Sequence, residues 1–140
     1  MSSSSPPLIL LYVEDDPVNA QLLEAAVRRK SGWAIVVVAS GNAALEWTRS
    51  QTPALLLLDI DLGDMTGVEL AHRLRGRAAL TEVPIVALSA DATPVTVKLA
   101  MDAGFLDYLT KPVNFRTLFA LLDHVAWLSG RGADQGHSPP

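Results

Sequence analysis

Short apolar runs alternate with amphipathic stretches along the chain. Five runs rich in Leu, Ile, Val and Ala have the length of β-strands, and they lie at 8–13, 34–39, 55–58, 84–88 and 105–109. Between and after them, apolar residues recur every three or four positions, which is typical of helices with one buried face. These stretches predict five helices, which begin near residues 17, 41, 67, 94 and 115.

Polar residues mark the starts of the predicted helices. Each expected helix follows a residue that can accept a hydrogen bond from the first turn, namely Asp16, Ser40, Thr66, Thr93 and Asn114. Pro17 suits the first position of its helix, where a missing N–H costs nothing. Glu69, three residues after Thr66, fits a capping box. Gly104 is expected to end the fourth helix.

The alternation of strands and helices predicts an α/β domain. Short connections and right-handed crossovers favour a five-stranded parallel sheet with helices on both faces. At this length the natural strand order is 2-1-3-4-5, as in flavodoxin-like folds. The Leu55 to Leu58 run would then be a central strand, buried on both sides.

Length and composition agree with a single compact domain. Of the 140 residues, we expect 8–128 to form the domain and 1–7 and 129–140 to be disordered, because the ends are rich in Ser, Pro and Gly. The net charge of -4 argues against a nucleic-acid-binding surface. The chain has no cysteine and no apolar run long enough to cross a membrane, so we expect a cytoplasmic protein without a membrane partner.

Residues with reactive or charged side chains stand where predicted strands end. Glu14 and Asp15 follow the first strand, Asp59 the third, Ser89 the fourth and Lys111 the fifth. In a parallel sheet of the expected order, these positions converge on one edge. Three crowded carboxylates should raise at least one pKa unless a cation is present, and Mg²⁺ prefers such oxygen ligands. The edge is therefore our candidate site.

Four short motifs in this order resemble the receiver domain of two-component response regulators. They are Val13-Glu14-Asp15, Leu58-Asp59, Leu88-Ser89-Ala90 and Tyr108-Leu109-Thr110-Lys111-Pro112, and the resemblance runs from about Leu8 to Leu128. It implies a signalling module rather than an enzyme, in which Asp59 accepts a phosphoryl group from a phosphohistidine.

The resemblance also implies roles for the other residues of this edge. Glu14, Asp15 and Asp59 would hold Mg²⁺ or Mn²⁺ together with the backbone carbonyl of Asp61. Ser89 and Lys111 would contact the phosphoryl oxygens. Ser89 and Tyr108 would form the switch, and the Lys111–Pro112 bond would be cis. Where the family commonly has a proline, this chain has Gly63, which predicts a more mobile loop after Asp59.

The partners implied by the family are a sensor histidine kinase or a histidine phosphotransfer protein, and a downstream protein target. Because the sequence ends soon after Leu128, we expect an output through protein contacts without nucleic acid. In the fourth helix, Val97, Ala100 and Met101 can face the core. Val95 and Leu99 point elsewhere and are candidates for a partner or homodimer surface.

Two other functions compete with the signalling module. Asp59-Ile60-Asp61 also resembles the Asp-x-Asp of haloacid-dehalogenase-like phosphatases, whose second Asp is a general acid. Those enzymes usually continue with Gly-Thr, which Leu62-Gly63-Asp64 does not match, and their motif opens the first strand of the fold, whereas this one ends the third. A receiver-like module that only binds partners is disfavoured because every expected site residue is present.

Overall fold

A computed structural model of the protein describes residues 5–130. The predicted disorder of residues 1–4 and 131–140 lies outside the described residues. The strands are β1 (Leu8–Val13), β2 (Trp33–Val38), β3 (Leu55–Asp59), β4 (Ile85–Ser89) and β5 (Asp107–Thr110). The helices are α1 (Pro17–Arg28), α2 (Gly41–Trp47), α3 (Gly67–Arg75), α4 (Pro94–Asp102) and α5 (Phe115–Leu128), with a short 3₁₀ helix η1 at Ala78–Leu80.

The strands form one parallel sheet in the order β2-β1-β3-β4-β5, which confirms the predicted fold. β3 is central and pairs with β1 on one side and β4 on the other. In this register Val13 lies opposite Leu58, and Asp59 lies opposite Leu88. The carboxyl ends of β1, β3 and β4 therefore come together at one edge of the sheet.

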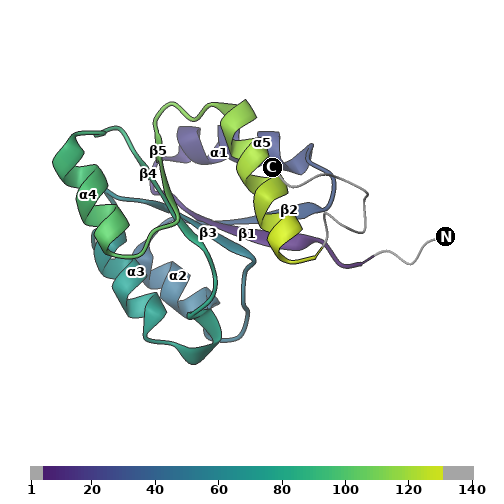
Figure 1. Ribbon diagram of the computed structural model, residues 1–140, viewed down its shortest axis with the longest axis horizontal. Coiled ribbons are helices and arrows are strands. Elements are labelled where there is room, and N and C mark those ends of the chain that lie inside the picture. The colour runs from purple at the N-terminus through teal and green to yellow at the C-terminus, as the bar shows by residue number, and fades with distance from the viewer. Residues whose placement is uncertain (1–4, 131–140) are drawn as a thin grey trace.

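Helices cover both faces of the sheet. Figure 1 shows α1 and α5 on one face and α2, α3 and α4 on the other. Side chains of β3 alternate between these layers, so that Leu57 joins the α1–α5 cluster while Leu56 and Leu58 join the opposite one. All four leucines of 55–58 are fully buried. Burial of each leucine contributes about 2 kcal/mol, which makes β3 a firm support for Asp59 at its end.

The predicted helix caps are confirmed. The side chains of the five expected cap residues accept backbone hydrogen bonds from the first turns of their helices. The capping box is only half formed, because Glu69 pairs with Arg73 at 2.9 Å while the Glu69 N–H donates to Thr66. No helix among residues 5–130 combines the length and the apolar character that crossing a membrane requires.

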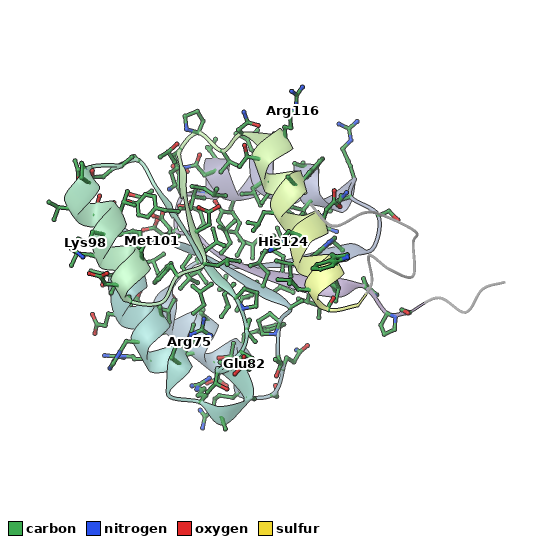
Figure 2. The ribbon with its side chains drawn as sticks, viewed as in Figure 1. Arg75, Glu82, Lys98, Met101, Arg116 and His124 are labelled. Carbon is green, nitrogen blue, oxygen red and sulfur yellow. The ribbon has the colours of Figure 1, made fainter. Side chains whose placement is uncertain are left out.

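Two expectations about the fourth helix and fifth strand are wrong. Met101 on α4 (Figure 2) is 43% exposed rather than buried in the core, and the buried residue of this helix is Ala100. The fifth strand begins at Asp107 rather than at Phe105. The Phe105 N–H donates to the Ala100 carbonyl, so Phe105 lies in the turn that follows α4.

Candidate functional site

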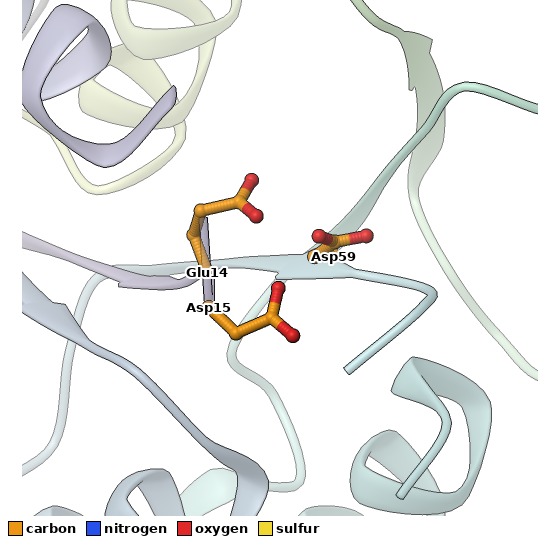
Figure 3. A group of neighbouring side chains, drawn as sticks. All are labelled: Glu14, Asp15 and Asp59. Carbon is orange, nitrogen blue, oxygen red and sulfur yellow. The ribbon is translucent and has the colours of Figure 1, made fainter. Parts of the chain in front are cut away.

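Three carboxylates meet at the carboxyl edge of the sheet. Glu14 and Asp15 directly follow β1, and Asp59 is the last residue of β3; Figure 3 shows the three side chains converging. One oxygen from each lies within 4.8 Å of the others. Glu14 and Asp59 are only 2% and 3% exposed, whereas Asp15 is open to solvent. The pairing of β3 with β1 produces this cluster from residues far apart in the sequence.

Lys111 joins two of these carboxylates. Its Nζ lies 2.9 Å from Asp59 Oδ2 and 2.9 Å from Glu14 Oε1. The other oxygen of Asp59, Oδ1, accepts the N–H of Asp61 at 3.0 Å. Lys111 follows β5, and its peptide bond to Pro112 is cis. Both oxygens of Asp59 are therefore hydrogen-bonded.

Burial and the neighbouring charges shift the pKa values of Glu14 and Lys111. Burial raises the pKa of the Glu14 carboxyl, and the neighbouring Asp59 raises it further against the opposing effect of Lys111. For Lys111, burial lowers the pKa, but hydrogen bonds to Asp59 and Glu14 outweigh burial and raise it overall. Lys111 is thus held in its charged form, as a counter-charge to the carboxylates.

Ser89 and Tyr108 lie beside this cluster without entering it. Ser89 ends β4 and is buried; its Oγ accepts the Asp91 N–H at 3.0 Å, and its carbonyl accepts the Lys111 N–H at 2.9 Å. Tyr108 of β5 is half-buried, and its hydroxyl donates to the Asp91 backbone carbonyl. Asp91 therefore connects both residues to the loop between β4 and α4.

Close packing of α3 fixes the backbone around Asp59. A Cβ atom at Gly67 would lie 2.6 Å from the Asp59 carbonyl oxygen and 2.9 Å from Ile60 Cα. The Gly67 N–H also donates to the Ile60 carbonyl at 2.8 Å. Only glycine allows the first turn of α3 to approach the end of β3 this closely.

The loop after Asp59 is attached at two places. Asp61 and Thr66 form an isolated antiparallel bridge. Asp64 accepts the N–H groups of Gly41 and Asn42, at 3.0 Å and 2.9 Å, at the start of α2. Both backbone hydrogen bonds lower the pKa of Asp64, and the one from Asn42 has the larger effect. Gly63 thus lies in a loop whose two sides are held by hydrogen bonds.

The donor set suits a hard divalent cation. All three side chains of the cluster offer carboxylate oxygens, and Asp15 leaves one side open to water. Mg²⁺ and Mn²⁺ prefer oxygen ligands and commonly keep several waters. Burial first, and then the neighbouring Asp59, raises the pKa of Glu14, and a cation at this position would offset the negative charge of these carboxylates.

The structure also brings in two residues that the sequence did not single out. Tyr12 is buried, and its hydroxyl donates to Glu14 Oε1 at 2.8 Å. Its place two residues before Glu14 could have indicated this contact, since alternate residues of a strand share a face. Asp64 is the second, and nothing local in the sequence indicates its contact with residues 41 and 42.

Comparisons with known proteins identify the family. The family model described as "Response regulator receiver domain" matches residues 10–123. The transcriptional regulatory protein CseB of Streptomyces coelicolor is 37% identical over 111 residues, which are 79% of this chain and 46% of that protein. The DNA-binding response regulator MtrA of Mycolicibacterium smegmatis is also 37% identical, over 79% of this chain and 47% of that protein. The chain spans about half the length of these relatives.

Solved structures agree in fold. A putative response regulator from Chloroflexus aurantiacus superposes with a TM-score of 0.79 at 30% identity, covering 85% of this chain and 97% of that one. The Mn²⁺-bound form of response regulator Rcp1 gives 0.71 at 25% identity, over 87% and 95% of the chains. The receiver domain of Saccharomyces cerevisiae Ssk1, solved with the phosphotransfer protein Ypd1, gives 0.78 at 26% identity, over 91% and 94%.

These matches do not favour the haloacid-dehalogenase-like alternative. The family model covers most of β1 through most of α5, and it includes every residue that converges on the carboxyl edge of the sheet. The chain belongs to the receiver domains of two-component response regulators.

Proposed function

We propose that this receiver domain accepts a phosphoryl group on Asp59. The observation that carries the proposal is the position of the Asp59 carboxylate, which lies 2.9 Å from Lys111 and within 4.8 Å of Glu14 and Asp15. In the reaction, an Asp59 oxygen forms a bond to phosphorus while the phosphorus–nitrogen bond of a phosphohistidine breaks. The electron pair of that bond leaves with the histidine nitrogen, and the product is an acyl phosphate.

Glu14, Asp15 and Asp59, with the backbone carbonyl of Asp61, are the proposed ligands of Mg²⁺ or Mn²⁺. A bound divalent cation would offset negative charge on the carboxylates and on the transferring group. Lys111 adds a positive charge 2.9 Å from Asp59 Oδ2, and it is already charged and oriented. Such prepositioned charge is the main contribution that a protein makes to phosphoryl transfer.

Ser89 and Tyr108 are the proposed switch. After transfer, Ser89 and Lys111 would bind phosphoryl oxygens through charge-assisted hydrogen bonds. Ser89 Oγ now accepts the Asp91 N–H, and Tyr108 donates to the Asp91 carbonyl. A change at Ser89 is therefore passed through Asp91 to Tyr108 and to the surface of α4, β5 and α5.

The proposed phosphodonor is a sensor histidine kinase or a histidine phosphotransfer protein, in keeping with the Ssk1–Ypd1 complex. We place the domain in the cytoplasm. The proposed output is contact with a downstream protein, or with a second copy through α4, where Val95 and Leu99 are exposed. Relatives such as MtrA are named for DNA binding. For residues 8–128 we propose no direct contact with nucleic acid, because the net charge of the chain is negative.

One experiment tests the proposed function. The protein is incubated with Mg²⁺ and acetyl phosphate, and its intact mass is followed with time. We expect one phosphoryl adduct in the wild type and none in Asp59→Asn, whereas Asp107→Asn, an exposed aspartate at the start of β5, keeps it. An adduct that persists in Asp59→Asn overturns the assignment. Rapid turnover of unrelated phosphoesters would restore the phosphatase alternative.

A further inference from the structure

The buried hydroxyl of Tyr12 is tied to the candidate site. Tyr12 is 1% exposed, and its ring packs in the α1–α5 side of the core with residues such as Leu10 and Leu57. Its hydroxyl donates to Glu14 Oε1 at 2.8 Å. A hydroxyl in the core needs a partner, and Glu14 provides it. The contact reaches from the hydrophobic core directly to the carboxylate cluster.

Glu14 Oε1 serves two donors at once. It accepts the Tyr12 hydroxyl and also the Lys111 ammonium, at 2.9 Å. Its second oxygen, Oε2, accepts the Asp16 N–H at a longer 3.2 Å. A glutamate side chain has more rotatable bonds than an aspartate side chain. These donors are therefore needed to hold the Glu14 carboxylate in one orientation.

Lys111 is shared between Glu14 and Asp59. Its Nζ lies 2.9 Å from an oxygen of each. A phosphoryl group on Asp59, as in the proposed function on which this inference rests, presents new anionic oxygens to Lys111. When Lys111 turns toward them, Glu14 Oε1 loses its charged donor and keeps the Tyr12 hydroxyl. A buried carboxylate oxygen without any donor is costly.

We propose that Tyr12 is a positioning residue for phosphorylation, which holds Glu14 in place and allows Lys111 to leave it for the phosphoryl group. Tyr12 touches neither the phosphorus nor Asp59, and it acts through Glu14 alone. In Tyr12→Phe the ring still fills its place in the core, so the variant removes one hydrogen bond and leaves no cavity.

The first test measures phosphorylation. With Mg²⁺ and acetyl phosphate, we expect Tyr12→Phe to form the Asp59 adduct about tenfold more slowly, the effect of losing one hydrogen bond to a charged group. Thr48→Val is the matched control, because Thr48 is also buried and hydrogen-bonded but lies at the end of α2. Its rate should stay within about twofold of the wild type. In a Glu14→Ala background, Tyr12→Phe should change the rate by less than about twofold, because its partner is absent.

The second test needs neither metal nor phosphodonor. The chain has three lysines, at 30, 98 and 111, so their side-chain ammonium signals can be separated by NMR of ¹⁵N-lysine-labelled protein. We expect the Lys111 signal to move in Tyr12→Phe, because Glu14 Oε1 then has no competing donor. Lys30 and Lys98 pair with Asp123 and Asp102 elsewhere on the surface, and their signals should not move.

The outcomes separate this inference from the proposed function. If the wild type forms an adduct that requires Asp59, but Tyr12→Phe matches its rate and its Lys111 signal, the role of Tyr12 is overturned and the proposed function stands. A slower rate that persists unchanged in the Glu14→Ala background also overturns it, because the effect would not pass through Glu14. If the wild type forms no adduct, both proposals fall together.

Discussion

Lys111 and Asp59 are 52 positions apart in the sequence, yet the lysine Nζ lies 2.9 Å from Asp59 Oδ2. The same ammonium lies 2.9 Å from Glu14 Oε1. Lys111 thus bridges two buried carboxylates, and its charge offsets the repulsion between them. The Lys111 charge therefore stabilises the fold and also has a role in the proposed phosphoryl transfer.

Removal of this charge should destabilise the protein most when no metal is present. In Lys111→Met we expect the free energy of unfolding to fall by about 2 kcal/mol without Mg²⁺, because Asp59 and Glu14 lose their counter-charge. Saturating Mg²⁺ should reduce that loss, since a cation offsets the same carboxylates. Urea unfolding with and without MgCl₂ measures both values.

Lys98→Met is the control for this prediction. Lys98 pairs with Asp102 at 3.0 Å on the open surface of α4, where ion pairs contribute about 0.5 kcal/mol or less. Its small effect should be the same with and without Mg²⁺. An equal loss in Lys111→Met under both conditions would contradict a shared role of lysine and metal.

The approach of α3 to the end of β3 predicts a sharp difference between two glycines. Gly67→Ala places a Cβ 2.6 Å from the Asp59 carbonyl oxygen, so the backbone around Asp59 must shift. We expect a loss of about 2 kcal/mol in unfolding free energy, measured by urea denaturation. At Gly63 the nearest atom to an added Cβ is Asp15 Oδ2, at an ordinary 3.7 Å. Gly63→Ala should therefore leave the free energy of unfolding unchanged or slightly raised. Equal losses of unfolding free energy in the two variants would show that close packing at Gly67 is not the cause.

Asp64 should make stability depend on pH. Hydrogen bonds from Asn42 and Gly41 hold the folded pKa of Asp64 below its ordinary value of 3.8. A lowered carboxyl pKa stabilises the fold above the unfolded pKa, and this contribution is lost as the pH falls through the folded pKa. Asp64→Asn leaves one acceptor for two N–H groups, so we expect it to cost about 1 kcal/mol at pH 7.

The pH profile distinguishes this effect from simple damage to the loop. The difference in unfolding free energy between wild type and Asp64→Asn should shrink as the pH is lowered below the ordinary aspartate range. Denaturant unfolding at several pH values measures it. A difference that stays constant down to acid pH would mean that the charge of Asp64 is not involved.

The exposed apolar pair on α4 tests the homodimer proposal. Val95 and Leu99 are 69% and 57% exposed, so Leu99→Glu should leave stability within about 0.5 kcal/mol. If α4 forms the dimer surface, this variant should weaken self-association of the phosphorylated protein in sedimentation velocity experiments. Leu22→Glu on α1 is the matched control at 59% exposure. Identical association of wild type and both variants would rule out α4.

Much of the fold could be predicted because its signals are local. Asp16 before Pro17 marks the start of α1, and the unbroken Leu55–Leu58 run indicates a strand covered on both faces. The start of β5 could not be predicted from the sequence. It is set by the first residue that pairs with β4, and this is Asp107, which pairs with Val86. Exposure of Met101 depends likewise on how α4 is rotated against the sheet, which helical periodicity does not specify for a helix that is apolar on more than one side.

For the candidate site, the strand ends predicted which residues meet but not how they bond. The convergence of Glu14, Asp15, Asp59 and Lys111 follows from strand order alone. That Lys111 bridges two carboxylates depends on side-chain conformation and on the path of the chain after β5. The tether from Asp64 to Gly41 depends on two loops whose relative position no local pattern reveals.

The central place of β3 has a consequence for how a signal can leave this domain. β3 is hydrogen-bonded to β1 and β4, and these two strands also bring Glu14 and Ser89 to the site. The strands cannot slide without breaking ladders on both sides of fully buried leucines. Amide hydrogen exchange at Leu56 to Leu58 should therefore be among the slowest in the protein, before and after phosphorylation alike. A signal that leaves this domain must therefore pass through the loops at the carboxyl edge, because the sheet itself does not move.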